Sequence, residues 1–83
     1  MTRQEILRLL TEVFSDVLDV NVVLKESATT RDIPMWDSLN HVQLMIAVER
    51  KFGISFTARD IEFLKSISDL ISLIQKKQKN GFY

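Results

Sequence analysis

The chain has 83 residues, of which 46% are apolar, so it is long enough to bury the core of one small domain over residues 1–83. Its 11 basic and 11 acidic residues cancel, so the chain lacks the basic excess that is typical of nucleic-acid-binding proteins. Because it has one histidine and no cysteine, the sequence predicts no disulfide, no thiolate nucleophile and no metal site.

Residues 2–18 have the pattern of a helix with one apolar face. Thr2 followed by Glu5 fits a capping box, in which each side chain bonds the backbone amide of the other residue at a helix start. The apolar residues recur at helical spacing, which places them together: Ile6, Leu9, Leu10, Val13, Phe14 and Val17. The sequence therefore predicts a first helix over residues 2–18.

Residues 19–37 lack this periodicity and form a long predicted loop. Pro34 pushes Ile33 toward an extended conformation and prevents a helix from continuing through this point. Loops of this length are uncommon in a compact domain and are often functional. The alternative is a plain crossover between two helices, held to the core by Val22, Val23, Leu24 and Ile33.

A second helix is predicted over residues 38–52. Asp37 and Ser38 are both residue types that cap helix starts, and Gly53 is typical of a helix end. Apolar residues occupy more than one face, so we expect one stripe in the core and a second patch for a partner, unless the helix is fully buried. One stripe can be formed by Val42, Met45, either Val48 or Glu49, and Phe52, with Leu39 and Ile46 on its flank.

Two further helices are predicted over residues 58–64 and 67–79. Each follows a hydroxyl residue with an acidic residue three positions later: Thr57 with Asp60, and Ser66 with Asp69. Asn80 and Gly81 are typical of a helix end. Since only two glycines and one proline are present, turns are few, and the sequence predicts an all-α four-helix bundle with a long first loop and a short third helix.

Ser38 has two possible roles at the start of the second helix. As an ordinary N-cap it would stabilise the helix, and its replacement by alanine would cost about 1 kcal/mol. Alternatively, its hydroxyl could carry a phosphate ester, because free backbone amides and the positive end of the helix dipole both favour an anion there. The residue pattern alone leaves both roles open.

Residues 36–44 (WDSLNHVQL) and 49–54 (ERKFGI) resemble the acyl carrier protein family. In that family an Asp-Ser-Leu motif opens the second helix of a four-helix bundle, and the serine receives 4′-phosphopantetheine from coenzyme A. The order of long loop, motif helix, short helix and last helix matches over nearly the whole chain. The resemblance implies that Ser38 carries the arm, that its thiol holds an acyl group as a thioester, and that the chain has no catalytic activity of its own.

The resemblance also implies roles for the residues around Ser38. Asp37 would help the phosphopantetheinyl transferase and its magnesium ion to engage the site. Leu39 and Ile46 would contact partner enzymes, although packing in the core is an equal alternative for both. The expected partner-binding residues are Trp36, Leu39, Asn40, Gln43, Ile46, Glu49 and Arg50.

This chain departs from the carriers of general fatty acid synthesis in its charges. Those carriers have a row of carboxylates along the second helix, which basic patches on partner enzymes recognise. The corresponding positions here hold Asn40, Gln43 and Arg50, and only Glu49 keeps the charge. Missing and opposite charges disfavour the usual partners, so we expect a dedicated pathway. Trp36, near the serine, also favours a dedicated pathway, unless its only role is to cover the core beneath the loop.

The expected partners are a phosphopantetheinyl transferase, an acyl-loading ligase or acyltransferase, and the synthases of the pathway. No apolar run is long enough to cross a bilayer and no signal peptide is evident, so we expect a cytoplasmic protein. We also expect it to act as a monomer. A peptidyl or aminoacyl carrier and a helical adaptor remain alternatives. An enzyme built on Ser38 and His41, three residues apart on a helix, would also need an orienting group, an oxyanion hole and a pocket, for which a small helical bundle offers little room. A DNA-binding helix would need more basic residues.

Overall fold

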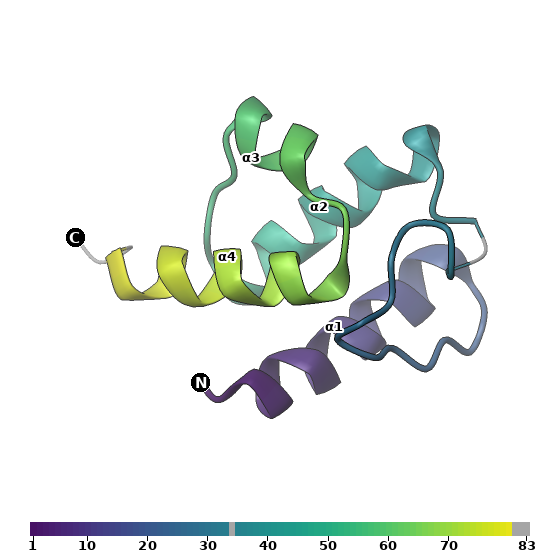
Figure 1. The fold of residues 1–83 in the computed structure, drawn as a ribbon, viewed down its shortest axis with the longest axis horizontal. Helices are drawn as coiled ribbons and strands as arrows, with labels where there is room; N and C mark the ends of the chain where they lie inside the picture. Colours follow the sequence, from purple (N-terminus) through teal and green to yellow (C-terminus); the bar gives the residue numbers. More distant parts are fainter. Residues whose placement is uncertain (34, 81–83) are drawn as a thin grey trace.

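The computed structural model describes residues 1–33 and 35–80 and confirms the all-α fold. Four helices follow one another along the chain (Figure 1): α1 (Arg3–Leu18), α2 (Ser38–Phe52), α3 (Ala58–Phe63) and α4 (Ile67–Asn80). The described residues form no strand, and their one β-bridge joins Thr29 to Ser66. None of the described helices is both long enough and apolar enough to cross a membrane.

The helix starts follow the capping signals in the sequence. Thr2 precedes α1 as its N-cap and forms the predicted capping box with Glu5, so the helix begins one residue later than predicted. Thr57 and Asp60 form a second box at α3, and the Ser66 hydroxyl accepts the Asp69 amide at the start of α4.

The first two helices end as predicted, and the ends of the third and fourth differ from the predictions by one residue. The third helix ends at Phe63, because Leu64 has an extended backbone, and the fourth continues to Asn80. Gly53 ends α2 in the left-handed conformation, with φ of 67°, as its position predicts. Pro34 and the expected stop at Gly81 lie outside the described residues.

The core lies where α1 packs against both α2 and α4, while α3 buries no residue of its own. The second helix contributes Leu44, Met45 and Val48, all fully buried. Val42 was predicted in this stripe, but it lies outside the buried face and is 52% exposed. The core also contains Ile6, Leu10, Val13, Phe14, Leu18, Leu24, Ile33, Trp36, Leu64, Ile67, Leu70, Ile71 and Ile74.

The long loop is held both by side chains and by its backbone. Leu24 and Ile33 are buried as predicted, whereas Val23 is 85% exposed and contributes nothing to the core. The backbone also pairs with the start of α4: the Ile67 amide donates to the Ala28 carbonyl and the Ser68 amide donates to the Glu26 carbonyl, each at 2.9 Å. This pairing ties the loop to the junction between α3 and α4.

The first turn of α1 is joined to the same region. The Arg3 guanidinium donates to the Glu26 carboxylate at 2.8 Å and to the Ser68 hydroxyl at 3.2 Å. The start of α2 lies near one end of the long axis of the molecule, and the N-terminus and the end of α4 lie toward the other (Figure 1).

Candidate functional site

Ser38 is the first residue of α2, and Asp37 is the N-cap. One oxygen of the Asp37 carboxylate, Oδ1, accepts both the Leu39 amide at 3.1 Å and the Asn40 amide at 2.9 Å. The choice between two possible caps is therefore resolved in favour of Asp37. The side chain of Ser38 is exposed, and its hydroxyl has no hydrogen bond to any residue that the structure describes. This hydroxyl is accessible to a modifying enzyme.

Two of the backbone amides that we expected to be free near Ser38 are occupied by Asp37. An anion on the serine would therefore sit at the positive end of the helix dipole without binding the Leu39 or Asn40 amides. Since Oδ1 makes both capping bonds, Oδ2 of Asp37 has no hydrogen bond to the described part of the chain.

Trp36 lies beneath this helix start and is buried, with 5% of its surface exposed. Its ring meets Phe14 edge-on, with centroids 5.2 Å apart and planes at 89°. It also stacks on the His41 ring, with centroids 5.9 Å apart and planes at 29°. The core-capping role that the sequence left open for Trp36 is the one observed, and its burial leaves little surface for a partner to contact.

His41 is half-buried and both of its ring nitrogens are hydrogen-bonded. The Trp36 indole Nε1–H donates to Nδ1 at 2.9 Å, and Nε2 lies 3.0 Å from the Ile61 carbonyl oxygen. An indole N–H can only donate, so Nδ1 must accept, and the ring proton must lie on Nε2 and donate to Ile61. Both ring nitrogens of His41 are therefore used within the fold. Neither nitrogen is free to act as a base toward Ser38.

A cleft of about 340 Å³ opens beside Ser38. One wall comes from the residues that start α2, and the other comes from α3 and the residue after it. The cleft is lined by Thr30, Trp36, Asp37, Ser38, His41, Ile61, Glu62 and Leu64. The Trp36–His41–Ile61 contacts lie within this lining, so they join the two walls.

The outward face of α2 is apolar near Ser38 and basic near its end. Leu39 is 75% exposed and Ile46 is 45% exposed, which excludes the core-packing alternative for both. Gln43 and Arg50 are also exposed, and the four residues recur at helical spacing along one face.

Two of the other expected partner residues are held within the fold. The Asn40 amide group donates to the Met35 carbonyl at 2.8 Å. The Glu49 carboxylate accepts the Phe56 amide at 2.7 Å and so fixes the connection to α3. The one acidic side chain of α2 is therefore used internally, and the exposed charges of this helix are those of Arg50 and Lys51.

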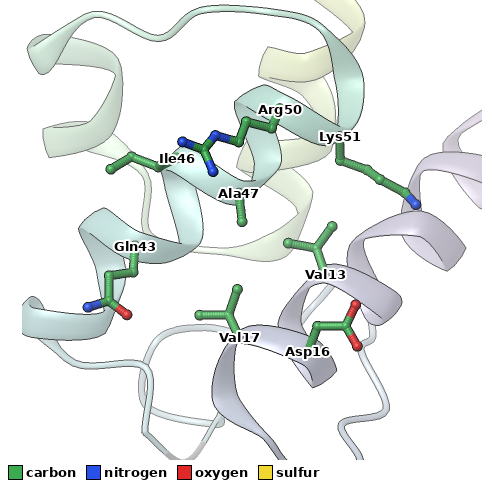
Figure 2. Close-up of a pocket in the computed structure, with 8 residues that line it drawn as sticks. All are labelled: Val13, Asp16, Val17, Gln43, Ile46, Ala47, Arg50 and Lys51. Atoms are coloured by element: carbon green, nitrogen blue, oxygen red, sulfur yellow. The ribbon is translucent and has the colours of Figure 1, made fainter.

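A groove of about 490 Å³ lies between α1 and α2. Figure 2 shows Val13 and Val17 reaching into it from α1 and Ala47 from α2. The remaining lining residues, Asp16, Gln43, Ile46, Arg50 and Lys51, include three of the predicted partner residues. Arg50 and Lys51 form no ion pair with the residues that the structure describes. This groove continues the exposed face of α2.

Residues 8–74 match the protein family described as "Phosphopantetheine attachment site". The chain is 32% identical over 79 residues to the acyl carrier protein of Thermosynechococcus vestitus, covering 93% of this chain and 96% of that protein. It is 37% identical over 78 residues to the acyl carrier protein of Campylobacter hominis, covering 83% and 98%. The meromycolate extension acyl carrier protein of Mycolicibacterium smegmatis is 28% identical over 82 residues, covering 96% and 82%.

Two solved structures of acyl carrier proteins also superpose on this chain. The solution structure of a holo acyl carrier protein from Geobacter metallireducens superposes with a TM-score of 0.81 at 34% sequence identity, covering 90% of this chain and 87% of that one. The crystal structure of an acyl carrier protein from Thermotoga maritima has a TM-score of 0.85 at 20% identity, covering 96% and 94%, which supports the fold.

Proposed function

Because the chain belongs to the acyl carrier protein family, whose members carry phosphopantetheine and are not themselves enzymes, we propose that Ser38 is the attachment site. The observation that carries this proposal is the position of an exposed, unbonded serine hydroxyl at the first residue of α2, beside Asp37. When attached, the arm supplies a thiol that holds the acyl group as a thioester. With no cysteine in the chain, no protein thiol competes for that acyl group.

Asp37 has two tasks in this proposal. Its Oδ1 holds the first turn of α2 in place, so the serine is presented on a fixed helix end. Its Oδ2 faces the transferase and helps to engage that enzyme's magnesium ion. Magnesium prefers carboxylate oxygens and typically takes only one or two from protein, which matches a single free oxygen.

We further propose that the carrier serves a dedicated pathway through an apolar and basic surface. Leu39, Gln43, Ile46 and Arg50 form the exposed face of α2, and Lys51 adds a second positive charge at the groove. Partners are recognised by complementary charge, so the enzymes that fit this face present apolar side chains beside carboxylates. Enzymes that recognise carboxylate-rich carriers meet repulsion at Arg50 instead. The meromycolate extension relatives are examples of carriers with a specialised name.

The carrier is proposed to act as one domain over residues 1–83, as a monomer in the cytoplasm. The proposed partners are the phosphopantetheinyl transferase, a loading ligase or acyltransferase, and the pathway synthases. Each of them must bind and release the same face of α2, so the contacts are expected to be small and brief. An apolar patch with two positive charges at one end suits contacts of this kind.

Intact-mass measurement tests the attachment site directly. The full chain is incubated with coenzyme A, magnesium and a phosphopantetheinyl transferase of broad specificity, in parallel with Ser38→Ala and the matched control Ser55→Ala. The wild type and the control are expected to gain the mass of one phosphopantetheine, and Ser38→Ala is expected to gain none. An arm on the Ser38→Ala variant, or no arm on the wild type with its host's own transferase, would contradict the assignment.

A general fatty acid synthase enzyme tests the proposed partner surface. The acylated wild-type carrier is expected to be a poor substrate for a ketoacyl synthase of that pathway, with a raised KM. The double variant Gln43→Glu and Arg50→Glu restores acidic charge on the exposed face and is expected to lower that KM. Equal KM values for this chain and for an acidic carrier would argue against a dedicated pathway.

A further inference from the structure

We propose that His41 is a positioning residue that holds α3 in place as the far wall of the cleft beside Ser38. This inference rests on the proposed function of Ser38 and adds a residue to it. The consequence is that a transferase or synthase approaching the serine meets one fixed arrangement of α2 and α3.

A continuous set of contacts connects the core to α3 through His41. Phe14, fully buried in α1, packs against Trp36 with the two rings perpendicular. Trp36 stacks on His41 and donates a hydrogen bond to its Nδ1. His41 then donates from Nε2 to the Ile61 carbonyl oxygen in α3 at 3.0 Å. Because the histidine is held on one side by a buried ring, the direction of its bond to Ile61 is fixed.

Helix α3 depends on such contacts more than the other helices do. It has six residues, none of which is fully buried and only one of which, Ile61, packs against the core. A helix of that length is not stable by itself in water. Two other bonds hold it: Glu49 accepts the Phe56 amide before its start, and Lys77 of α4 pairs with Asp60 at 2.9 Å. His41 provides the bond on the side that faces the cleft, three residues from Ser38.

Two conservative substitutions separate the roles of the two ring nitrogens. In His41→Asn, the amide oxygen takes the place of Nδ1 and can accept from Trp36, but nothing reaches Ile61. In His41→Gln, the amide nitrogen takes the place of Nε2 and can donate to Ile61, but nothing accepts from Trp36. Only the bond to Ile61 connects to α3, so the proposal predicts a defect in the asparagine variant and rescue in the glutamine variant.

Two measurements on the full chain read out this difference. Amide hydrogen exchange over residues 58–64 is expected to be about three- to tenfold faster in His41→Asn than in the wild type, as the loss of one net hydrogen bond predicts. Arm transfer from coenzyme A to Ser38 is expected to show a KM for the carrier raised several-fold, with kcat unchanged, because the reacting hydroxyl is untouched. The values for His41→Gln are expected to lie close to those of the wild type.

The outcomes distinguish this inference from the function on which it rests. If the wild type accepts no arm at Ser38, the proposed function fails, while the exchange rates still report on α3. If the wild type accepts the arm and neither variant differs from it in exchange or KM, His41 does not position α3. If both variants are impaired equally, ring packing rather than the bond to Ile61 is responsible, and the proposal is overturned.

Discussion

Replacing Asp37 by alanine is expected to destabilise the fold, and replacing Ser38 by alanine is not. Asp37→Ala removes both capping hydrogen bonds at the start of α2, a loss of about 1 kcal/mol and up to about 2 kcal/mol. It also removes a negative charge at the positive end of the helix, which adds about 0.3–1 kcal/mol. Ser38→Ala removes no hydrogen bond to the described residues and is expected to stay within about 0.5 kcal/mol of the wild type.

Thermal and urea unfolding of the unmodified chain, followed by circular dichroism, measure both effects. For a domain of this size, each kcal/mol lowers Tm by about 4–8 °C, so the two variants are easily separated. Asp37→Asn is the matched control, because asparagine caps a helix as well as aspartate does and loses only the charge. If Ser38→Ala lowers Tm as much as Asp37→Ala, then Ser38 shares the capping role, and the argument that its hydroxyl is free is refuted.

Three further substitutions test the fold around the site. Gly53→Ala is expected to cost about 1–2 kcal/mol through its positive φ alone, because a Cβ there meets open space; an unchanged urea midpoint would contradict this. Phe14→Ala is expected to lower the free energy of unfolding by about 3–5 kcal/mol, which is enough to abolish cooperative melting in a domain this small. A variant that melts near the wild-type Tm would refute the role of Phe14 in supporting Trp36. The Thr57 amide and the Lys77 ammonium lower the pKa of Asp60 below its ordinary value of 3.8. The ionised carboxylate therefore stabilises the fold above pH 3.8, and this contribution disappears as the pH falls through the pKa of the folded state. Asp60→Asn should therefore lower stability at neutral pH and flatten the acid limb of the stability curve, and an unchanged acid limb would exclude this contribution.

The helix starts could be predicted from the sequence because their signals are local. Thr2 reaches the amide three residues ahead, and Thr57 does the same, so the pattern and the bond lie within one turn. Gly53 likewise predicts its own conformation, since few other residues adopt a positive φ. The Asp-Ser-Leu motif predicts the candidate site, but two adjacent capping residues left open which of them is the helix cap.

The contacts that could not be predicted join residues distant in the sequence. The pairing of residues 26–28 with residues 67–68 uses backbone atoms, which leave no signal in the side chains. The sequence indicates only that Glu49 is a carboxylate on the surface of a helix. Its hydrogen bond to the Phe56 amide depends on the path of the loop that follows the helix, which the sequence does not predict. The five-residue spacing of Trp36 and His41 was a usable signal, because an indole donor just before a helix can reach an imidazole in its first turn.

The N-terminus and the end of α4 lie away from the start of α2, where the cargo would be tethered (Figure 1). A bead, an affinity label or a second polypeptide joined before α1 or beyond α4 would therefore leave the face beside Ser38 unobstructed. An immobilised carrier would keep its arm directed toward the solution, so successive enzymes could be passed over one loaded surface and their products collected in turn. The same geometry would let this unit be built into a longer assembly-line polypeptide without redesign of its docking face.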